Sequence, residues 1–402
     1  YTGREYKEYD FSVPSQILAM VGGSAHTLLV PDDAKSIMVY SYVEAPGQEK
    51  IHEFDPDEYI GLWQVSPDGK YLLIERNLSD ATSVYVFDTN SGKIIGQKEL
   101  PALTRCAAFS ENGLLFGMTD DSVQYYDFEK DTVETVMSKA DSYFTYYTNT
   151  SKTYMVLFQY DRLRIISVET RKIVFDTTLN QEQFVAVSEN ADYVILSGVD
   201  GLFAIRTGDG SRIAFDEHIN LMQVYDLQIP FAHDSSYAAI PGTDQYIHIV
   251  DLKSGKTISR IAGASADVFS GCFIKDDTVF VFQSNDYRIR AASVDSGRLL
   301  YTGEDEIGEV KLWSYDSTLQ TLTAVSDINS LILDISDGIY PTAEIPYFIA
   351  FSQDMKYVYV FDSYTLGRFP YRGLKDLYTI AGDILVDRTL SEENRMKYYI
   401  DG

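Results

Sequence analysis

Apolar runs and polar turns alternate in a pattern that recurs about every forty residues along this chain. In its clearest copy, strand-like runs at 62–65, 71–74 and 84–88 are separated by a Ser-Pro-Asp-Gly turn at 66–69 and followed by an Asn-Ser-Gly-Lys hairpin at 90–93. The strands are apolar on both faces, so one unit needs a neighbour on each side to cover it. A repeat of this length, built from short strands, is typical of a β-propeller.

The turns after the first strand mark nine candidate units, near residues 22, 66, 110, 149, 188, 233, 275, 315 and 352. Propellers usually have four to eight blades, so nine units are one too many. We predict an all-β fold, a single propeller over 1–372. Strands from the first sixty residues would complete the blade begun by residues 346–372, which gives eight blades. Seven blades, with one unit outside the ring, is the alternative.

The C-terminal tail changes its period. Leu374, Leu377, Tyr378 and Ala381 follow steps of three and four residues, the spacing of an amphipathic helix. Ser391 is a typical N-cap residue for a second short helix. We therefore predict a helical C-terminal extension over 373–402, packed on the propeller.

Composition limits the classes of partner. The chain has 402 residues, 45% of them hydrophobic, which is enough for a large core and excludes a disordered protein. The formal net charge is -27, so nucleic acid is not expected as a partner, because its phosphates would be repelled. A cationic peptide or protein would be attracted. The alternative is that the acidic surface serves only solubility.

Several segments bear on the compartment. Cys106 and Cys272 lie in apolar runs and are expected to be buried thiols, which excludes a disulfide framework. Residues 11–31 carry no charge, but Pro14 and a Gly-Gly-Ser turn interrupt them, so two core strands are favoured and no membrane insertion is expected. Since the chain opens at Tyr1, we interpret it as a processed product or a piece of a longer protein. Both the cytoplasm and the extracytoplasmic side of an anchored protein remain open.

The motifs resemble those of bacterial WD40-like propellers. The matching segments are Ser-Pro-Asp-Gly at 66–69, Val-Tyr-Val-Phe-Asp at 84–88, and Ser-Gly-Lys at 91–93 and 254–256. The tail at 388–399 is similar to the Arg-x-Leu-Thr-x-Glu-Glu…Tyr segment that follows the last repeat in many of these proteins. No Trp-Asp or Gly-His dipeptide occurs, so the hydrogen-bond tetrad of strict WD40 blades is not carried over. The resemblance implies a rigid interaction platform, often the sensing or docking part of a larger signalling protein.

Catalytic and cofactor templates do not match. The Gly-Lys-Thr at 255–257 has Val250 where a phosphate loop needs its first glycine, and no Gly-x-Ser-x-Gly elbow occurs. No metal-ligand spacing occurs, and the acidic pairs at 120–121 and 276–277 are interpreted as solvated turn residues. His248, in an apolar run, is interpreted as a hydrogen-bonded sheet residue. No catalytic residue, metal ligand or cofactor is predicted. The remaining histidines are expected to be solvated in or beside turns: His26, His52, His218 and His233.

Aromatic residues carry the remaining functional signal, because the chain contains 31 tyrosines. Some lie at the entry to the first strand of a unit, where a propeller opens its central channel. An aromatic and arginine ring at that mouth would suit a peptide or protein partner. Alternatively, these rings separate neighbouring blades. The candidate mouth residues are Trp63, Arg105, Tyr143, Tyr225, Trp313 and Tyr347.

The sequence therefore favours a non-catalytic, monomeric, protein- or peptide-binding propeller. One alternative is a propeller hydrolase or lactonase that uses channel carboxylates and a divalent metal. A third hypothesis is carbohydrate binding through exposed Tyr and Trp.

Overall fold

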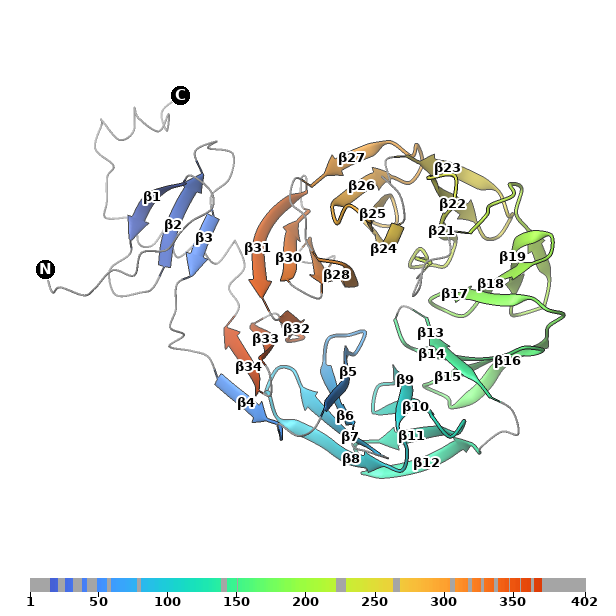
Figure 1. Ribbon diagram of the computed structural model, residues 1–402, viewed down its shortest axis with the longest axis horizontal. Helices are drawn as coiled ribbons and strands as arrows, with labels where there is room; N and C mark the ends of the chain where they lie inside the picture. Colours follow the sequence, from blue (N-terminus) through green and yellow to red (C-terminus); the bar gives the residue numbers. More distant parts are fainter. Residues whose placement is uncertain are drawn as a thin grey trace, which may run out of the picture.

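The computed structural model shows an arrangement of short antiparallel sheets around a common axis (Figure 1). It describes residues 15–20, 26–31, 38–41, 49–55, 59–77, 81–138, 143–149, 151–221, 229–262, 268–303, 308–316, 320–326, 329–335, 339–346, 348–354, 356–362 and 365–370. Every regular element within these ranges is a β-strand. None of the described residues forms a helix long and apolar enough to cross a membrane. The predicted helical extension, 373–402, lies outside the described residues.

Each sheet of the ring uses strands in chain order, and neighbouring strands are antiparallel. The first contains β5 (Tyr59–Val65), β6 (Tyr71–Asn77), β7 (Thr82–Asp88) and β8 (Ile94–Leu100). The sheets that follow are β9 (Thr104–Phe109), β10 (Gly113–Met118), β11 (Val123–Asp127) and β12 (Thr132–Met137); β13 (Thr145–Thr148), β14 (Tyr154–Gln159), β15 (Arg162–Ser167) and β16 (Lys172–Thr178); β17 (Gln183–Val187), β18 (Tyr193–Gly198), β19 (Gly201–Arg206) and β20 (Arg212–Ala214); β21 (Tyr237–Pro241), β22 (Ile247–Asp251) and β23 (Thr257–Ile261); β24 (Val268–Ile274), β25 (Val279–Ser284), β26 (Ile289–Ser293) and β27 (Leu299–Thr302); and β28 (Val310–Asp316), β29 (Thr321–Ser326), β30 (Asn329–Asp334) and β31 (Tyr340–Pro346).

The last sheet joins the two ends of the repeat. It contains β32 (Phe348–Phe351), β33 (Tyr357–Asp362), β34 (Thr365–Pro370) and, beside β34, the early strand β4 (Glu49–Glu53). Arg368 holds this pairing, because its Nε donates to Glu49 at 2.7 Å and its Nη1 donates to the carbonyl of Asn90 in the next sheet at 2.9 Å. A strand from the first sixty residues thus completes the sheet that 348–370 begin.

The first repeat unit stands apart from the ring. Its strands, β1 (Ser15–Met20), β2 (His26–Pro31) and β3 (Met38–Ser41), pair only with one another. In Figure 1 this small sheet lies outside the ring. These three strands therefore contribute nothing to the sheets of the ring, and the Gly-Gly-Ser segment at 22–24 lies outside the described residues.

The core lies between successive sheets. Leu73 and Val84 of one sheet pack with Phe109 and Phe116 of the next, and all four side chains are buried. Second strands such as β10 are buried along their whole length, whereas outer strands such as β16 are largely exposed. The apolar runs of the repeat therefore become the inner layers, each covered by a neighbour on both sides.

The recurring Asp and Ser-Gly-Lys motif forms the hairpin between the third and fourth strands. Asp88 Oδ1 accepts a hydrogen bond from the backbone N–H of Ser91 at 2.7 Å, and Asp251 Oδ1 accepts one from Ser254 at 2.6 Å. The glycine that follows each serine has a positive φ, +74° at Gly255, which explains why glycine recurs there. The motif is thus a structural turn.

The strand arrangement defines two faces of the ring. A chain that crosses four antiparallel strands returns to the side on which it entered, so the links between sheets lie on one side. The turns between second and third strands lie on this same side, which we call the connector face; its described turns are at 119–122, 160–161, 199–200, 242–246 and 285–288. The opposite side, which carries the remaining turns, is the hairpin face.

The sheet of β21 to β23 departs from the four-strand pattern. Among the described residues, the segment before it makes two isolated bridges, Phe231 with Ala238 and Leu221 with Gly242, so β21 takes the second position. The turn between β21 and β22 therefore lies on the connector face, like the other turns between second and third strands.

Candidate functional site

Two of the predicted mouth residues, Arg105 and Tyr143, come together on the connector face. The Arg105 guanidinium lies 4.4 Å from the centroid of the Tyr143 ring, and its Nη1 is 3.5 Å from Asp121 Oδ1. Nη1 also donates to the carbonyl of Phe144 at 3.2 Å, which ties two neighbouring sheets together. Tyr143 keeps 66% of its surface exposed, so one side of this cluster is open to solvent.

Trp313 has a packing role. It is half-buried in β28, and its indole Nε1 donates to Ser270 Oγ of the preceding sheet at 3.0 Å. It also packs against the apolar core between these two sheets. This is the role of a ring between neighbouring blades, the alternative that the sequence left open for the aromatic residues.

The other candidates are less defined. Trp63 lies in β5, where its backbone is opposite Ile74. Tyr225 and Tyr347 lie outside the described residues. Their role in binding therefore stays a prediction.

A second set of exposed residues on the connector face was missed by the sequence interpretation. These residues lie at the turns between second and third strands of consecutive sheets. Their exposed fractions are 68% for Tyr160, 94% for Val199, 41% for Tyr246 and 41% for Tyr287. The sequence offered one signal by which they could have been found. Each of these residues stands beside or near an aspartate in a short turn, and these turns recur at the repeat spacing.

Some connector-face carboxylates are neutralised within the chain. Arg290 Nη1 donates to Asp286 Oδ1 at 2.8 Å, and this guanidinium holds the pKa of Asp286 far below its usual range. Asp121 has Arg105 nearby. The side chains of three further aspartates are exposed and make no ion pair among the described residues: Asp120, Asp161 and Asp200.

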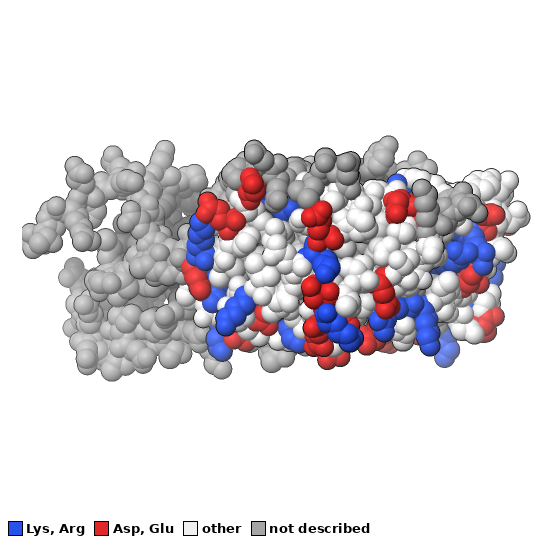
Figure 2. Space-filling model, turned by 90° about the horizontal axis from the view of Figure 1, so that it is seen from below, with Lys and Arg blue, Asp and Glu red and all other residues white. Residues whose placement is uncertain are grey.

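The outer strands of the ring have a different charge pattern from the connector face. Figure 2 shows Lys and Arg side chains interspersed with Asp and Glu around the outer strands, seen from below in the orientation of Figure 1. Acidic and basic groups are thus mixed there, so this side presents no large area of a single charge.

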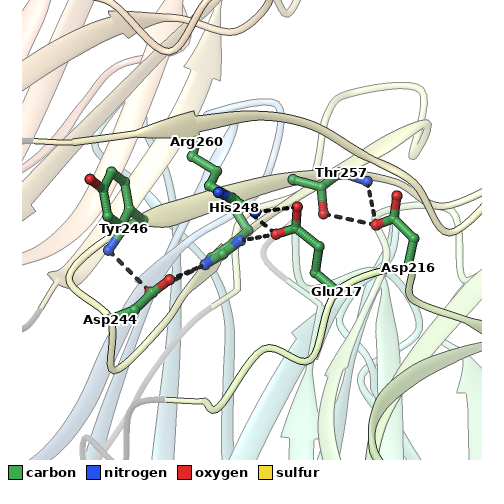
Figure 3. Close-up of polar contacts among 7 residues, drawn as sticks. All are labelled: Asp216, Glu217, Asp244, Tyr246, His248, Thr257 and Arg260. Carbon is green, nitrogen blue, oxygen red and sulfur yellow. Dashed lines mark hydrogen bonds and ion pairs between the residues drawn. The ribbon is translucent and has the colours of Figure 1, made fainter.

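His248 lies in a polar cluster beside the connector face (Figure 3). Its ring is buried, with Nδ1 3.1 Å from Glu217 Oε2 and Nε2 3.1 Å from Asp244 Oδ2. Arg260 Nε donates to the same Glu217 oxygen at 3.0 Å and lowers the pKa of that carboxyl. The interpretation of His248 as a hydrogen-bonded sheet residue is confirmed.

This cluster fixes the segment at 215–221 to its sheet. Asp216 Oδ1 accepts hydrogen bonds from the backbone N–H of Thr257 at 2.9 Å and from its hydroxyl at 3.1 Å (Figure 3). The backbone N–H of Asp216 in turn donates to the carbonyl of Gly255 at 2.9 Å. The contacts therefore serve to hold a connector against β23.

Of the other histidines, His218 is exposed, as expected, whereas two make contacts besides solvent. His52 lies in β4, with its ring centroid 4.5 Å from that of Phe54. His233 is 63% exposed, but its Nδ1 is 2.6 Å from Asp277 Oδ1. His26 lies in β2, and His218 adjoins Gly201, whose added Cβ would lie 3.0 Å from His218 Nδ1. At His52 and His233 the side chains therefore make specific contacts.

Among the described residues, Glu75 is a buried acidic group with an incomplete set of hydrogen-bond partners. Glu75 is 1% exposed; its Oε2 accepts a hydrogen bond from Thr104 Oγ1, and its Oε1 is buried without a hydrogen-bond partner. Burial raises the pKa of Glu75 to about 7. Burial also lowers the pKa of Lys152 to about 8. The two cysteines are free and partly buried, and desolvation raises the pKa of Cys106 to about 12.

Within the described ranges, no group of three or more His, Cys, Asp or Glu side chains is placed to hold a metal ion.

Comparison with known proteins identifies the fold. No protein-family model and no curated protein matches the sequence. Among solved structures, the C-terminal WD40 domain of Sif2 is similar, with a TM-score of 0.58 and 13% identity over 81% of this chain and 99% of that one. The computationally designed Ika8 protein gives a TM-score of 0.58 and 13% identity over 80% of this chain and 100% of the design.

A further similar structure is Hsv2 of Kluyveromyces lactis, with a TM-score of 0.51 and 12% identity over 72% of this chain and 99% of that one. At these identities the likeness concerns the fold alone. Together with the antiparallel sheets around a common axis, it shows that this chain has a β-propeller fold similar to that of WD40 domains.

Proposed function

We propose that this chain is a non-catalytic protein- or peptide-binding platform, built as an eight-bladed propeller, whose contact surface is the connector face. The observation that carries this proposal is the series of exposed apolar side chains on its turns: Tyr160, Val199, Tyr246 and Tyr287. Exposed apolar groups that recur on one face of a soluble protein mark an interaction surface.

The turns hold these side chains on a rigid base. Tyr160 belongs to a two-residue turn closed by the pairing of Gln159 with Arg162. Val199 belongs to a similar turn closed by Gly198 and Gly201. Because the backbone is already ordered, a partner would lose little conformational freedom of the platform on binding. Tyrosine adds a large contact area for few rotatable bonds.

The charge of the chain supports a cationic partner. With a formal net charge of -27, the chain attracts basic proteins at long range and repels nucleic acid. Membership of a larger bacterial protein, a helical extension over 373–402 and a monomeric state belong to the same proposal.

A peptide-display selection tests the proposed surface. Peptides selected on the wild-type chain should bind a fourfold serine variant at least about tenfold more weakly, because each lost anchor removes buried contact. The variant is Tyr160→Ser, Val199→Ser, Tyr246→Ser and Tyr287→Ser. A matched control replaces four exposed apolar residues of the outer strands: Ile95→Ser, Ile173→Ser, Val174→Ser and Leu300→Ser.

Two results would contradict the proposal. One is equal peptide binding by the wild-type chain and the fourfold variant, with circular dichroism showing that both are folded. The other is turnover of an ester or lactone together with a rise in melting temperature on adding Ca²⁺, Mg²⁺ or Zn²⁺ that EDTA reverses, because a bound metal stabilises the native state. The second result would favour the metal-dependent hydrolase.

A further inference from the structure

We propose that the partner presents arginine side chains to a patch on three consecutive sheets of the connector face. This inference rests on the proposed binding function and specifies the chemistry of the partner. The patch, which we call the Tyr-Asp patch, consists of Asp120, Tyr160, Asp161, Val199 and Asp200.

The patch combines exposure with a fixed backbone. Tyr160 and Asp161 form the whole turn between β14 and β15, and the carbonyl of Asp161 accepts a hydrogen bond from the backbone N–H of Leu179 at 2.8 Å. Val199 and Asp200 form the equivalent turn of the next sheet, where Gly201 has a φ of +107°. The carboxylates and the Tyr160 ring are therefore presented at defined positions.

Among the described residues, the carboxylates of the patch make no ion pair, whereas other connector-face acids do. Asp286 is paired with Arg290. The nearest arginine in sequence to Asp161 is Arg162, but its Nε and Nη2 donate to Asp176 of the outer strand at 2.7 and 2.6 Å. Asp120 accepts hydrogen bonds only from Ser122 among the described residues. Arg162 contributes its charge near Asp161 but makes no ion pair with it, so a cationic partner finds carboxylates here that are open to direct contact.

The chain contains an internal example of the contact that we propose. Arg105 lies over the Tyr143 ring and within 3.5 Å of Asp121, directly beside the patch. A guanidinium suits this combination because it is planar, stacks on an aromatic face and keeps its donors free for a carboxylate. A lysine ammonium is a point charge that cannot stack in the same way. Tyr160 and Asp161 offer the same two groups to an arginine from outside.

Fluorescence anisotropy with labelled repeat peptides tests the inference. An Arg-Gly peptide should bind the full chain more tightly than the matching Lys-Gly peptide, and a Glu-Gly peptide should not bind. The double variant Asp161→Asn with Asp200→Asn should weaken Arg-Gly binding by about tenfold, since each solvent-exposed ion pair contributes modestly. Tyr160→Leu keeps an apolar side chain but removes the aromatic face, and should reduce the preference for arginine over lysine.

A charge-matched control distinguishes the effect of the Tyr-Asp patch from the effect of the net charge of the chain. Asp276→Asn with Asp295→Asn removes the same charge from exposed positions on the hairpin face and should change binding less than twofold. Equal losses in the two double variants, or equal binding of the Arg-Gly and Lys-Gly peptides, would overturn the inference.

Failure of the arginine inference can be distinguished from failure of the proposed binding platform. If display-selected peptides depend on the connector face but contain no arginine, the platform stands and this inference fails. If no peptide depends on the connector face, the platform fails.

Discussion

Replacing the buried Glu75 by glutamine should stabilise the protein at neutral and alkaline pH. Glu75 lies on β6 between two sheets, where its carboxyl is 1% exposed and Thr104 donates its only hydrogen bond among the described residues. Burial disfavours the carboxylate and raises the pKa from 4.5 to about 7, although the Thr104 hydrogen bond and the charge of Lys152 act in the opposite direction. Glutamine has nearly the same shape and carries no charge to desolvate.

The size of the effect follows from this pKa difference. Below pH 4.5 both the folded and unfolded states hold the proton, so the stability of the wild type is fully present. As the pH rises, the unfolded chain releases its proton first, and stability is lost until the folded-state pKa of about 7 is passed. At about 1.4 kcal/mol per pH unit, the loss approaches about 3 kcal/mol. Glu75→Gln should therefore gain up to about 3 kcal/mol over the wild type at pH 8 and little at pH 4.5.

Urea denaturation at a series of pH values measures this difference. Glu99→Gln is the matched control, because it removes the same charge from an exposed position on β8 and should leave the pH dependence unchanged. The reasoning is refuted if the stability of Glu75→Gln runs parallel to that of the wild type between pH 4.5 and 8. It also fails if Glu99→Gln shows the same gain, since the effect would then come from net charge.

Three further predictions concern other parts of the ring. Asp277 raises the pKa of the partly exposed His233, so this pair stabilises the fold below about pH 6.5 and its contribution is lost as the pH rises through the folded-state pKa. Asp277→Asn should remove a contribution below about 1 kcal/mol at pH 5.5 and a smaller one at pH 8, where the backbone N–H of His233 still donates to Asp277 at 3.0 Å; melting temperatures at the two pH values measure this. Gly255→Ala should destabilise by about 1–3 kcal/mol more than Gly210→Ala, because both glycines have a positive φ but only at Gly255 would the new Cβ meet a backbone carbonyl, at 2.2 Å. Equal midpoints in urea would count against that steric argument. Cys106 should resist a thiol reagent at pH 8 until denaturant is added, since burial raises its pKa to about 12, and rapid labelling of the native chain would contradict the burial.

The repeat allowed much of the architecture to be predicted, because the turns and strands are encoded locally. The Ser-Pro-Asp-Gly turn at 66–69 separates β5 from β6, and the Ser-Gly-Lys hairpins lie between third and fourth strands as the spacing indicates. The pairing of β4 with β34 was also accessible, since the last unit lacked a strand. The number of blades was harder to derive, because nine similar units do not reveal which one pairs only with itself.

The candidate site was only partly accessible from the sequence. Arg105 and Tyr143 were both selected, and the structure brings them into contact, but their role in binding stays a prediction. Tyr160 and Val199 were missed because their exposure depends on lying in a two-residue turn, which apolar periodicity does not distinguish from a strand. Glu75 directly follows the apolar run at 71–74 and was not selected, because its burial depends on a sheet that follows later in the sequence.

The pairing of β4 with β34 has a consequence for how the protein is made. Glu49 and Arg368 are separated by 319 positions, so the early strand leaves the ribosome long before its partner exists. Until then the growing chain must keep two unpaired sheet edges from associating with other molecules, and closure of such a long loop slows the final step of folding. Nascent chains that stall before residue 365 should accordingly depend on chaperones, while in the finished chain β4 is paired with β34.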